Sequence, residues 1–227
     1  MIKLKALLTI QEKILNIISV NNIPNHKVEI IAVTKTFPQE AIIEAYKAGI
    51  LNIGENKIQE GEIKFPTLPN LPNLKKRLIG HLQSNKVNKA INLFDTIDTI
   101  DTKKIAKKIN HALDKNDKEV LLQVNISQDK AKFGFDYFEE EELLEIISYE
   151  RLNVKGLMTI GEHTKDINKT KKTFKTLRKL QENLNKYLVQ DKKLTVLSMG
   201  MSSDYEIAID EGSTQIRLGT ALFGSRG

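Results

Sequence analysis

The stretch Ile30-Ile31-Ala32-Val33-Thr34-Lys35 gives the clearest indication of the fold. It is a run of apolar, largely β-branched residues that ends on a lysine, and a helical pattern over residues 39–48 follows. A continuous apolar run is typical of a strand that is buried on both faces of a parallel sheet. The stretch therefore predicts a β-strand that leads into a helix, with Lys35 at the carboxyl end of the strand.

The alternation of strand and helix patterns continues along the chain. Short apolar runs predict strands over residues 28–33, 51–54, 77–80, 94–98, 119–125, 154–160, 194–198 and 215–218, with helical patterns between them. A further amphipathic pattern predicts a helix over residues 2–20. Eight strand–helix units favour an α/β fold, namely a (β/α)8 TIM barrel with an extra N-terminal helix.

An open, doubly wound sheet is the main alternative to the barrel. Such a sheet normally carries a glycine-rich fingerprint after its first strand, and none follows Val33. No linker or shift of composition divides residues 1–227, so we interpret them as a single domain. The final helix looks short, and we expect the N-terminal helix to cover that part of the barrel.

Composition limits the kinds of protein that this chain can be. The 227 residues include no cysteine, which excludes disulfides, thiolate metal sites and cysteine nucleophiles. The net charge is +6, but the lysines are scattered, so we expect no specific nucleic-acid binding. No signal-peptide pattern and no apolar run long enough to span a membrane are present. We therefore expect a cytoplasmic protein with no membrane contact.

In a barrel of parallel strands, the carboxyl ends of all strands meet on one face, where ligands bind. These ends carry Lys35, Asn56, His81, Gln83, Asn125, Met158, Met199, Ser202, Arg217 and Gly219. A lysine amine in a partly dry pocket becomes nucleophilic and can form a Schiff base with an aldehyde, either a substrate carbonyl or pyridoxal phosphate. The alternative is a lysine that reaches solvent or pairs with Glu55.

Two loops near the end of the chain indicate a phosphate site. Residues 198–204 and residues 217–224 each run from a predicted strand through a glycine into a helix start. Loops after the seventh and eighth strands, with backbone amides at a helix start, are the recurrent phosphate site of such barrels. Tight turns alone would also explain the glycines. Two such loops together with a lysine at a strand end indicate a phosphate site more specifically than either loop does alone.

At this point the sequence resembles the pyridoxal phosphate homeostasis proteins, whose barrel is similar to the N-terminal domain of alanine racemase. The resemblance covers essentially the whole chain and is carried by residues 32–35 (AVTK), 54–60 (GENKIQE), 81–86 (HLQSNK), 156–160 (GLMTI) and 198–224. It implies a barrel that binds pyridoxal 5′-phosphate. No metal site is expected.

The resemblance also implies roles for individual residues. Lys35 would form the Schiff base, and Arg217 would hold the pyridine nitrogen. An arginine does not readily give up its proton, so the ring nitrogen would stay unprotonated and the cofactor would be a poor electron sink. Ser202 would bind the phosphate together with backbone amides around Met201, Gly219 and Thr220.

The remaining carried-over residues have open alternatives. Asn56 and His81 would line the cofactor face, although His81 could equally be a packed histidine at a strand end. Met158 would form an apolar wall, or serve core packing alone. Lys132 matches a loop lysine that contacts phosphate or a departing cofactor, and a solvated lysine is the alternative.

Two classes of function compete. A carrier would hold pyridoxal phosphate reversibly, buffer it and deliver it to apo-enzymes as a monomer, with no catalytic residue. An alanine racemase-type enzyme would need a second proton donor opposite Lys35, which alanine racemase takes from a tyrosine across a dimer with a second domain. The chain ends where that domain would begin, and only Tyr205 lies near a predicted strand end. We favour the carrier.

A class I aldolase is a weaker alternative, because its lysine usually sits on a later strand.

Overall fold

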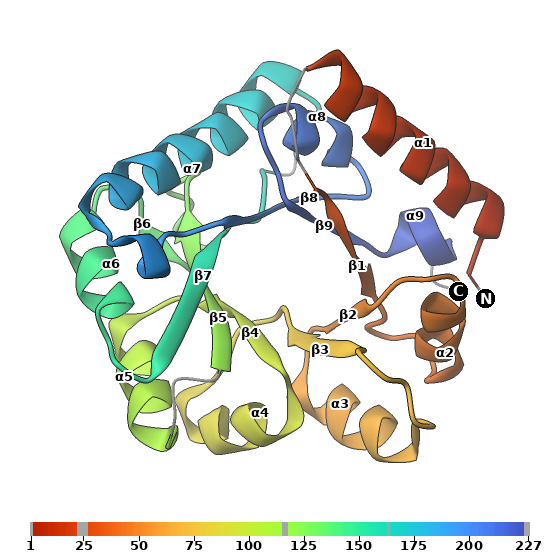
Figure 1. The fold of residues 1–227 in the computed structure, drawn as a ribbon, viewed down its shortest axis with the longest axis horizontal. Helices are drawn as coiled ribbons and strands as arrows, with labels where there is room; N and C mark the ends of the chain where they lie inside the picture. The colour runs from red at the N-terminus through yellow and green to blue at the C-terminus, as the bar shows by residue number, and fades with distance from the viewer. Residues whose placement is uncertain (1, 22–26, 115–117, 163, 225–227) are drawn as a thin grey trace.

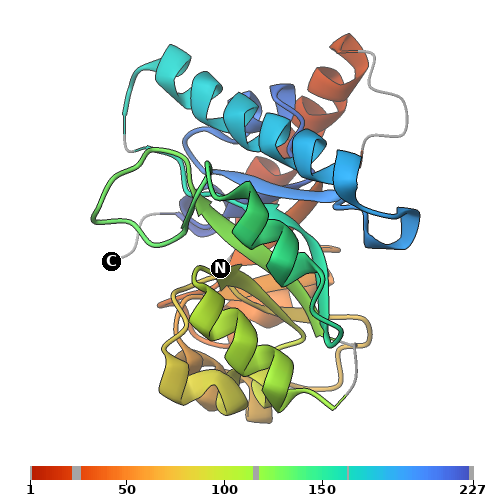
Figure 2. The ribbon, with the colours of Figure 1, turned by 90° about the vertical axis from the view of Figure 1, so that its left-hand side faces the viewer.

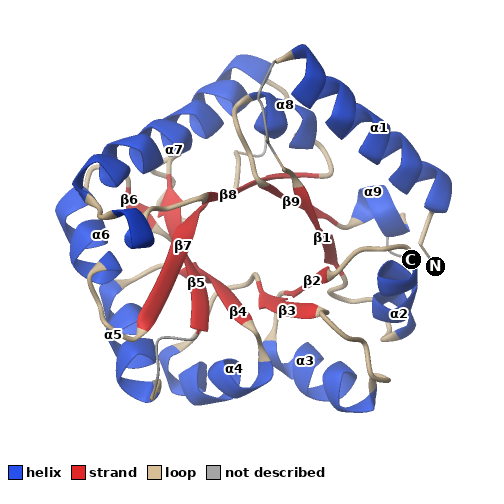
Figure 3. Cartoon of the chain, viewed as in Figure 1, coloured by secondary structure: helices blue, strands red, loops and turns tan. Residues whose placement is uncertain are grey.

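The computed structural model describes residues 2–21, 27–114, 118–162 and 164–224. Eight parallel strands form a closed barrel in this part of the chain, as predicted (Figures 1 and 3). They are β1 (Glu29–Val33), β2 (Asn52–Glu55), β3 (Lys75–Leu78), β4 (Thr96–Ile100), β5 (Lys118–Asn125), β7 (Leu152–Met158), β8 (Val196–Met201) and β9 (Gln215–Leu218). The ring closes because β1 pairs with both β2 and β9, while β4 pairs with β5.

Helices surround the barrel on its outer side (Figure 3). They are α1 (Leu4–Val20), α2 (Glu40–Lys47), α3 (Ile58–Lys64), α4 (Val87–Leu93), α5 (Lys103–Ala112), α6 (Glu140–Ile147), α7 (Ile167–Tyr187), α8 (Tyr205–Asp210) and α9 (Thr220–Phe223). Three short 3₁₀ segments are η1 (Phe65–Thr67), η2 (Ser84–Lys86) and η3 (Gln190–Lys192). Apolar strand residues such as Ile31, Ile53 and Ile97 have no exposed surface, because helices cover the outside of the sheet and side chains fill the inside.

The N-terminal helix takes the place that the short last helix leaves open. The last helix, α9, has four residues, and α1 packs against both α8 and α9 at the edge of the barrel (Figure 1). The backbone amide of Lys3 donates to the carbonyl of Leu222 over 2.8 Å, which ties the start of α1 to α9. This arrangement confirms the expectation that the N-terminal helix covers that part of the barrel.

One strand was not predicted. β6 (Phe135–Asp136) has two residues and pairs with β5 outside the ring. Figure 2 shows the loop that joins β5 to β6 projecting from the barrel. A two-residue strand has no periodicity of its own, so only its contact with β5 reveals it.

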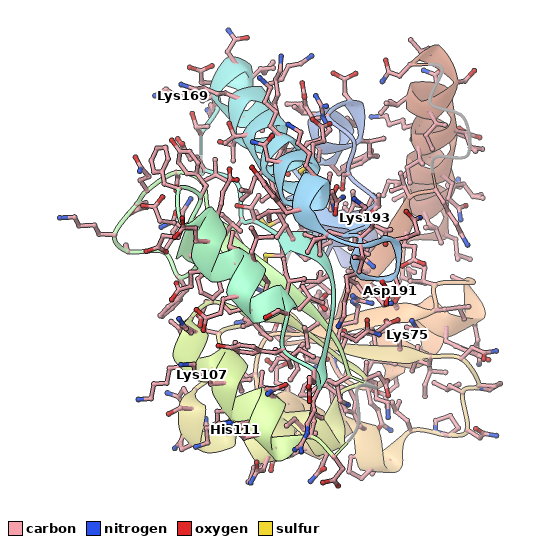
Figure 4. The ribbon with its side chains drawn as sticks, turned by 60° about the vertical axis from the view of Figure 1, so that its left-hand side comes forward. Lys75, Lys107, His111, Lys169, Asp191 and Lys193 are labelled. Atoms are coloured by element: carbon pink, nitrogen blue, oxygen red, sulfur yellow. The ribbon has the colours of Figure 1, made fainter. Side chains whose placement is uncertain are left out.

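Charged side chains are distributed over many elements. Figure 4 shows Lys107 on α5, Lys169 on α7 and Lys75 on β3 on different parts of the face that it presents. In the described ranges, no helix is both long and apolar enough to cross a membrane.

Candidate functional site

A cavity of about 390 Å³ lies at the carboxyl end of the barrel strands. Its lining comes from the ends of β1, β2, β3, β7, β8 and β9 and from the loops that follow them, including Val33, Lys35, Asn56, Ile79, Ile160, Met201, Ser202, Ser203, Arg217, Gly219 and Thr220. The lining includes seven of the nine residues that the sequence predicts as cofactor contacts. His81 and Met158 are not part of it.

A larger hollow of about 910 Å³ lies between α6 and α7, and its lining comes from the helices and from the segment just before α6. No barrel strand contributes a residue to it. Ligands of α/β barrels bind at the carboxyl ends of the strands, because several strand ends converge there. The smaller cavity is therefore the candidate site.

Lys35 lies in the turn that follows β1 and is partly buried. The residues before it, Val33 and Thr34, are buried. Val33, Ile79 and Ile160 give the cavity apolar walls beside the lysine. Ile79 and Ile160 lie just beyond β3 and β7, and neither was among the residues predicted to contact the cofactor. A primary amine between apolar walls has the setting that carbonyl capture requires.

Arg217 is a buried cation held by neutral oxygens. Its Nη1 donates to the carbonyl and the hydroxyl of Ser198, each over 2.8 Å, and its Nη2 donates to the carbonyl of Thr159 over 2.7 Å. Burial lowers the pKa of Arg217 to about 10, against the opposing charges of Asp98 and Asp204. In the part of the chain that the structure describes, no acceptor binds its Nε–H. The guanidinium therefore keeps a donor for a ligand in the cavity that it lines.

The two predicted phosphate loops meet at Ser202. The Ser202 hydroxyl oxygen accepts from the backbone amides of Gly219 over 3.3 Å and of Ala221 over 3.1 Å. The two loops thus gather a hydroxyl and two backbone amides within hydrogen-bonding distance. Ala221 was not among the predicted residues, because the register between the loops decides which amide is presented.

The amide of Met201 differs from its predicted role. It donates to the carboxylate of Asp204 over 2.6 Å, so it is engaged within its own loop. Burial raises the pKa of Asp204, while the Met201 amide and the charge of Arg217 act in the opposite direction. Met201 itself still lines the cavity.

His81 lies next to this cavity. It lines a neighbouring pocket of about 450 Å³, and Asn56 is shared by both pockets. The His81 ring stacks on Phe133 with centroids 3.8 Å apart, and its Nδ1 lies 2.6 Å from a carboxylate oxygen of Asp101. Burial raises the pKa of Asp101, and His81 opposes this shift. A cofactor contact for His81 stays a prediction.

Met158 and Lys132 also lie outside the cavity lining. Met158 is the last residue of β7 and has no exposed surface, in keeping with a packing role. Lys132 donates to the carbonyl of Gly161 over 3.2 Å and lines a small third pocket that shares Ile160 with the candidate site. Among the described residues, no group of acidic or histidine side chains is arranged to hold a metal ion.

Comparisons with known proteins show the family of the chain. The family model described as "Alanine racemase, N-terminal domain" matches residues 14–227. A pyridoxal phosphate homeostasis protein of Pasteurella multocida is 38% identical over 222 residues, which cover 96% of this chain and 94% of the relative. A protein of the same name from Bos taurus is 34% identical over 217 residues, covering 90% and 80% of the two chains.

Solved structures of similar proteins also match the fold of this chain. PipY of Synechococcus elongatus PCC7942, solved with pyridoxal phosphate bound, matches with a TM-score of 0.79 and 33% identity over 93% of this chain and all of that one. An alanine racemase of Clostridium difficile matches with a TM-score of 0.71 and 18% identity, covering 94% of this chain and 56% of that one, which shows a shared fold. The chain therefore belongs to the alanine racemase N-terminal domain family and, within it, to the pyridoxal phosphate homeostasis proteins.

Proposed function

We propose that this protein binds pyridoxal 5′-phosphate reversibly through Lys35 and that it stores and delivers the cofactor without catalysing a reaction on it. One observation carries the proposal: a lysine amine, a buried arginine and a loop pair rich in donors share a single cavity. The family and the cofactor bound by PipY support it.

The chemistry of these donors fits the cofactor. Bound pyridoxal phosphate supplies an aldehyde that condenses with a primary amine, and it presents a ring nitrogen and a phosphate that accept hydrogen bonds. Lys35 is the amine, and Arg217 keeps a donor suited to the ring nitrogen. The Ser202 hydroxyl is a donor suited to a phosphate, and the amides of Gly219 and Ala221, which donate to its oxygen in this structure, lie beside it. A cavity of about 390 Å³ also lies within the usual range for small-molecule sites.

The same residues favour a carrier over a racemase. A pKa near 10 keeps Arg217 protonated at neutral pH, so it can donate to a ring nitrogen but does not protonate it readily. Among the described residues that line the cavity, Lys35 and Arg217 are the only ionisable ones. Tyr205, the tyrosine nearest a strand end, is 7% exposed and is not part of that lining. Racemisation with two bases therefore lacks its second proton donor here.

The decisive experiment adds pyridoxal phosphate to the purified protein, reduces the mixture with borohydride and maps the modified peptide. We expect the label on Lys35, and we expect Lys35→Ala to lose nearly all of it. Lys57→Ala is the matched control, because Lys57 is an exposed lysine of the neighbouring pocket and should not change labelling. Labelling that persists on another lysine in Lys35→Ala would contradict the assignment.

Carrier and enzyme are separated by two further measurements. Loaded protein should reactivate an apo-enzyme that depends on pyridoxal phosphate, even when a scavenger removes free cofactor. Racemisation of common amino acids should stay near background, and strong turnover would restore the enzyme hypothesis. We further propose that the protein acts in the cytoplasm as a monomer, with apo-enzymes as its partners.

A further inference from the structure

Three charged side chains beside Lys35 are buried or partly buried and have no place in the cavity lining. They are Glu55 at the end of β2 and Glu60 and Lys64 on α3. Lys64 is 8% exposed, which is unusual for a lysine. Its Nζ donates to Glu55 over 2.8 Å, to Glu60 over 2.9 Å and to the carbonyl of Thr34 over 2.9 Å. An ammonium has three donors, and each has an acceptor here.

This network contacts the backbone on both sides of Lys35. On one side, Thr34 receives the Lys64 hydrogen bond at its carbonyl and donates its hydroxyl to Glu55 over 2.7 Å. On the other side, the backbone amide of Thr36 donates to Glu60 over 2.6 Å. Lys35 therefore lies between two residues that this network holds: Thr34 through Lys64 and Glu55, and Thr36 through Glu60.

The backbone of Thr36, whose amide donates to Glu60, has an unfavourable conformation. Its φ is 68°, in the left-handed region, where a β-branched residue is a genuine outlier. Thr36 is exposed, so packing does not hold it there. Two hydrogen bonds hold the left-handed turn: the Thr36 amide donates to Glu60 over 2.6 Å, and the Phe37 amide donates to the carbonyl of Thr34 over 3.1 Å. This turn sets the direction in which the chain leaves Lys35.

The pKa shifts of Glu55 and Glu60 agree with hydrogen bonds between these carboxylates, Lys64 and the two threonines. Burial raises the pKa of Glu55, while hydrogen bonds from Lys64 and Thr34 lower it. The pKa of Glu60 is lowered: burial raises it, but the Thr36 amide and Lys64 outweigh that effect. Glu60 is thus a charged acceptor at neutral pH, and a charged acceptor makes the stronger hydrogen bond to an amide.

We propose that Glu55, Glu60 and Lys64 are positioning residues that hold Thr34 and Thr36 and so aim the amine of Lys35 into the cavity. The proposal rests on the proposed function, because it concerns capture of the aldehyde of pyridoxal phosphate by Lys35. A purely structural role, in which the network only attaches α3 to the barrel, is the alternative. The two differ in whether cofactor capture depends on the conformation of Thr36.

The test replaces Glu60 by methionine and measures cofactor capture on folded protein. Glu60→Met removes the acceptor of the Thr36 amide, so we expect the dissociation constant for pyridoxal phosphate to rise by about tenfold or more. The visible absorption band of the bound cofactor should also shift. Glu62→Met is the matched control, because Glu62 lies on the same helix and pairs at the surface with Lys89 over 2.7 Å. We expect it to bind like the wild type.

A second substitution distinguishes positioning from attachment of α3. Glycine adopts a positive φ without strain. Thr36→Gly in the Glu60→Met background should therefore recover part of the lost affinity, whereas it adds no contact that could reattach α3. Should Glu60→Met fail to fold, Glu60→Asp keeps the charge beside Lys64 but is one methylene shorter. It should weaken capture in the same direction.

Three results would count against these ideas, each in its own way. If Glu60→Met carries the cofactor on Lys35 as tightly as Glu62→Met does, the positioning role is overturned. If Thr36→Gly recovers nothing, the Thr36 conformation is not the route, and the proposal also falls. Wild-type protein that captures no pyridoxal phosphate would instead overturn the proposed function itself.

Discussion

Two buried arginines point into the same barrel and have opposite surroundings. Arg77, on β3, is 3% exposed, and Arg217, on β9, is 5% exposed. Arg77 binds both carboxylate oxygens of Asp98, over 2.8 and 3.1 Å. Arg217 binds neutral oxygens of Ser198 and Thr159, and among the described residues it makes no ion pair.

The pKa values follow this difference. Burial lowers the pKa of Arg77, but the charge and hydrogen bonds of Asp98 outweigh burial, so the net shift is upward. The pKa of Arg217 falls to about 10, because the charges of Asp98 and Asp204 offset only part of the effect of burial. The comparison teaches that a satisfied buried cation serves structure, whereas one with spare donors beside a cavity is prepared for a ligand.

The largest effect should come from Arg77→Met. This change leaves Asp98, which has no exposed surface, without its counter-charge. We expect the free energy of unfolding to fall by about 3–5 kcal/mol, measured by urea denaturation. Cofactor capture per folded molecule should not change, since Arg77 does not line the cavity. A loss below about 1 kcal/mol would show that the pair is not structural.

A smaller loss of stability is expected from Arg217→Met. It removes hydrogen bonds to neutral oxygens, and the Ser198 carbonyl keeps the amide of Thr159 as a donor at 3.1 Å. We expect the free energy of unfolding to fall by about 1–3 kcal/mol. In contrast to Arg77→Met, affinity for pyridoxal phosphate should fall by about tenfold or more. Equal losses of unfolding free energy in Arg77→Met and Arg217→Met would contradict the proposed difference between a structural and a ligand-binding arginine.

The smallest effect should come from Asp204→Asn, beside Arg217. The asparagine can still accept from the Met201 amide, so stability at neutral pH should change little. Because the pKa of Asp204 is raised in the folded state, the folded protein binds this proton more readily than the unfolded chain does. Its contribution to stability is therefore present at low pH and lost as the pH rises through the folded pKa.

The free energy of unfolding, measured between pH 7 and pH 4, tests whether the pKa of Asp204 is raised or lowered in the folded protein. The wild type should gain more, or lose less, on acidification than Asp204→Asn does. The opposite order would mean that Arg217 lowers the pKa of Asp204 more than burial raises it.

Much of the fold could be predicted from the sequence, because parallel strands buried on both faces leave continuous apolar runs. The boundaries were less certain. The fourth strand was predicted over 94–98 and lies at Thr96–Ile100, since Phe94 is buried as the end of α4 and not as part of the strand. The short β6 depends on its contact with β5 and left no pattern.

For the site, the sequence by itself determined which groups are candidates: a lysine after the first strand and two glycine-containing loops near the end of the chain. Only the tertiary structure decided which residues share the cavity. His81 and Met158 also lie at strand ends, yet one stacks on Phe133 and the other is buried, because barrel register and side-chain direction decide what a strand end faces. The same holds for the two arginines. The residues around each arginine in the sequence did not reveal that Asp98 pairs with Arg77, or that Arg217 makes no ion pair among the described residues. The partners lie on neighbouring strands, and only the packing of the barrel brings them together.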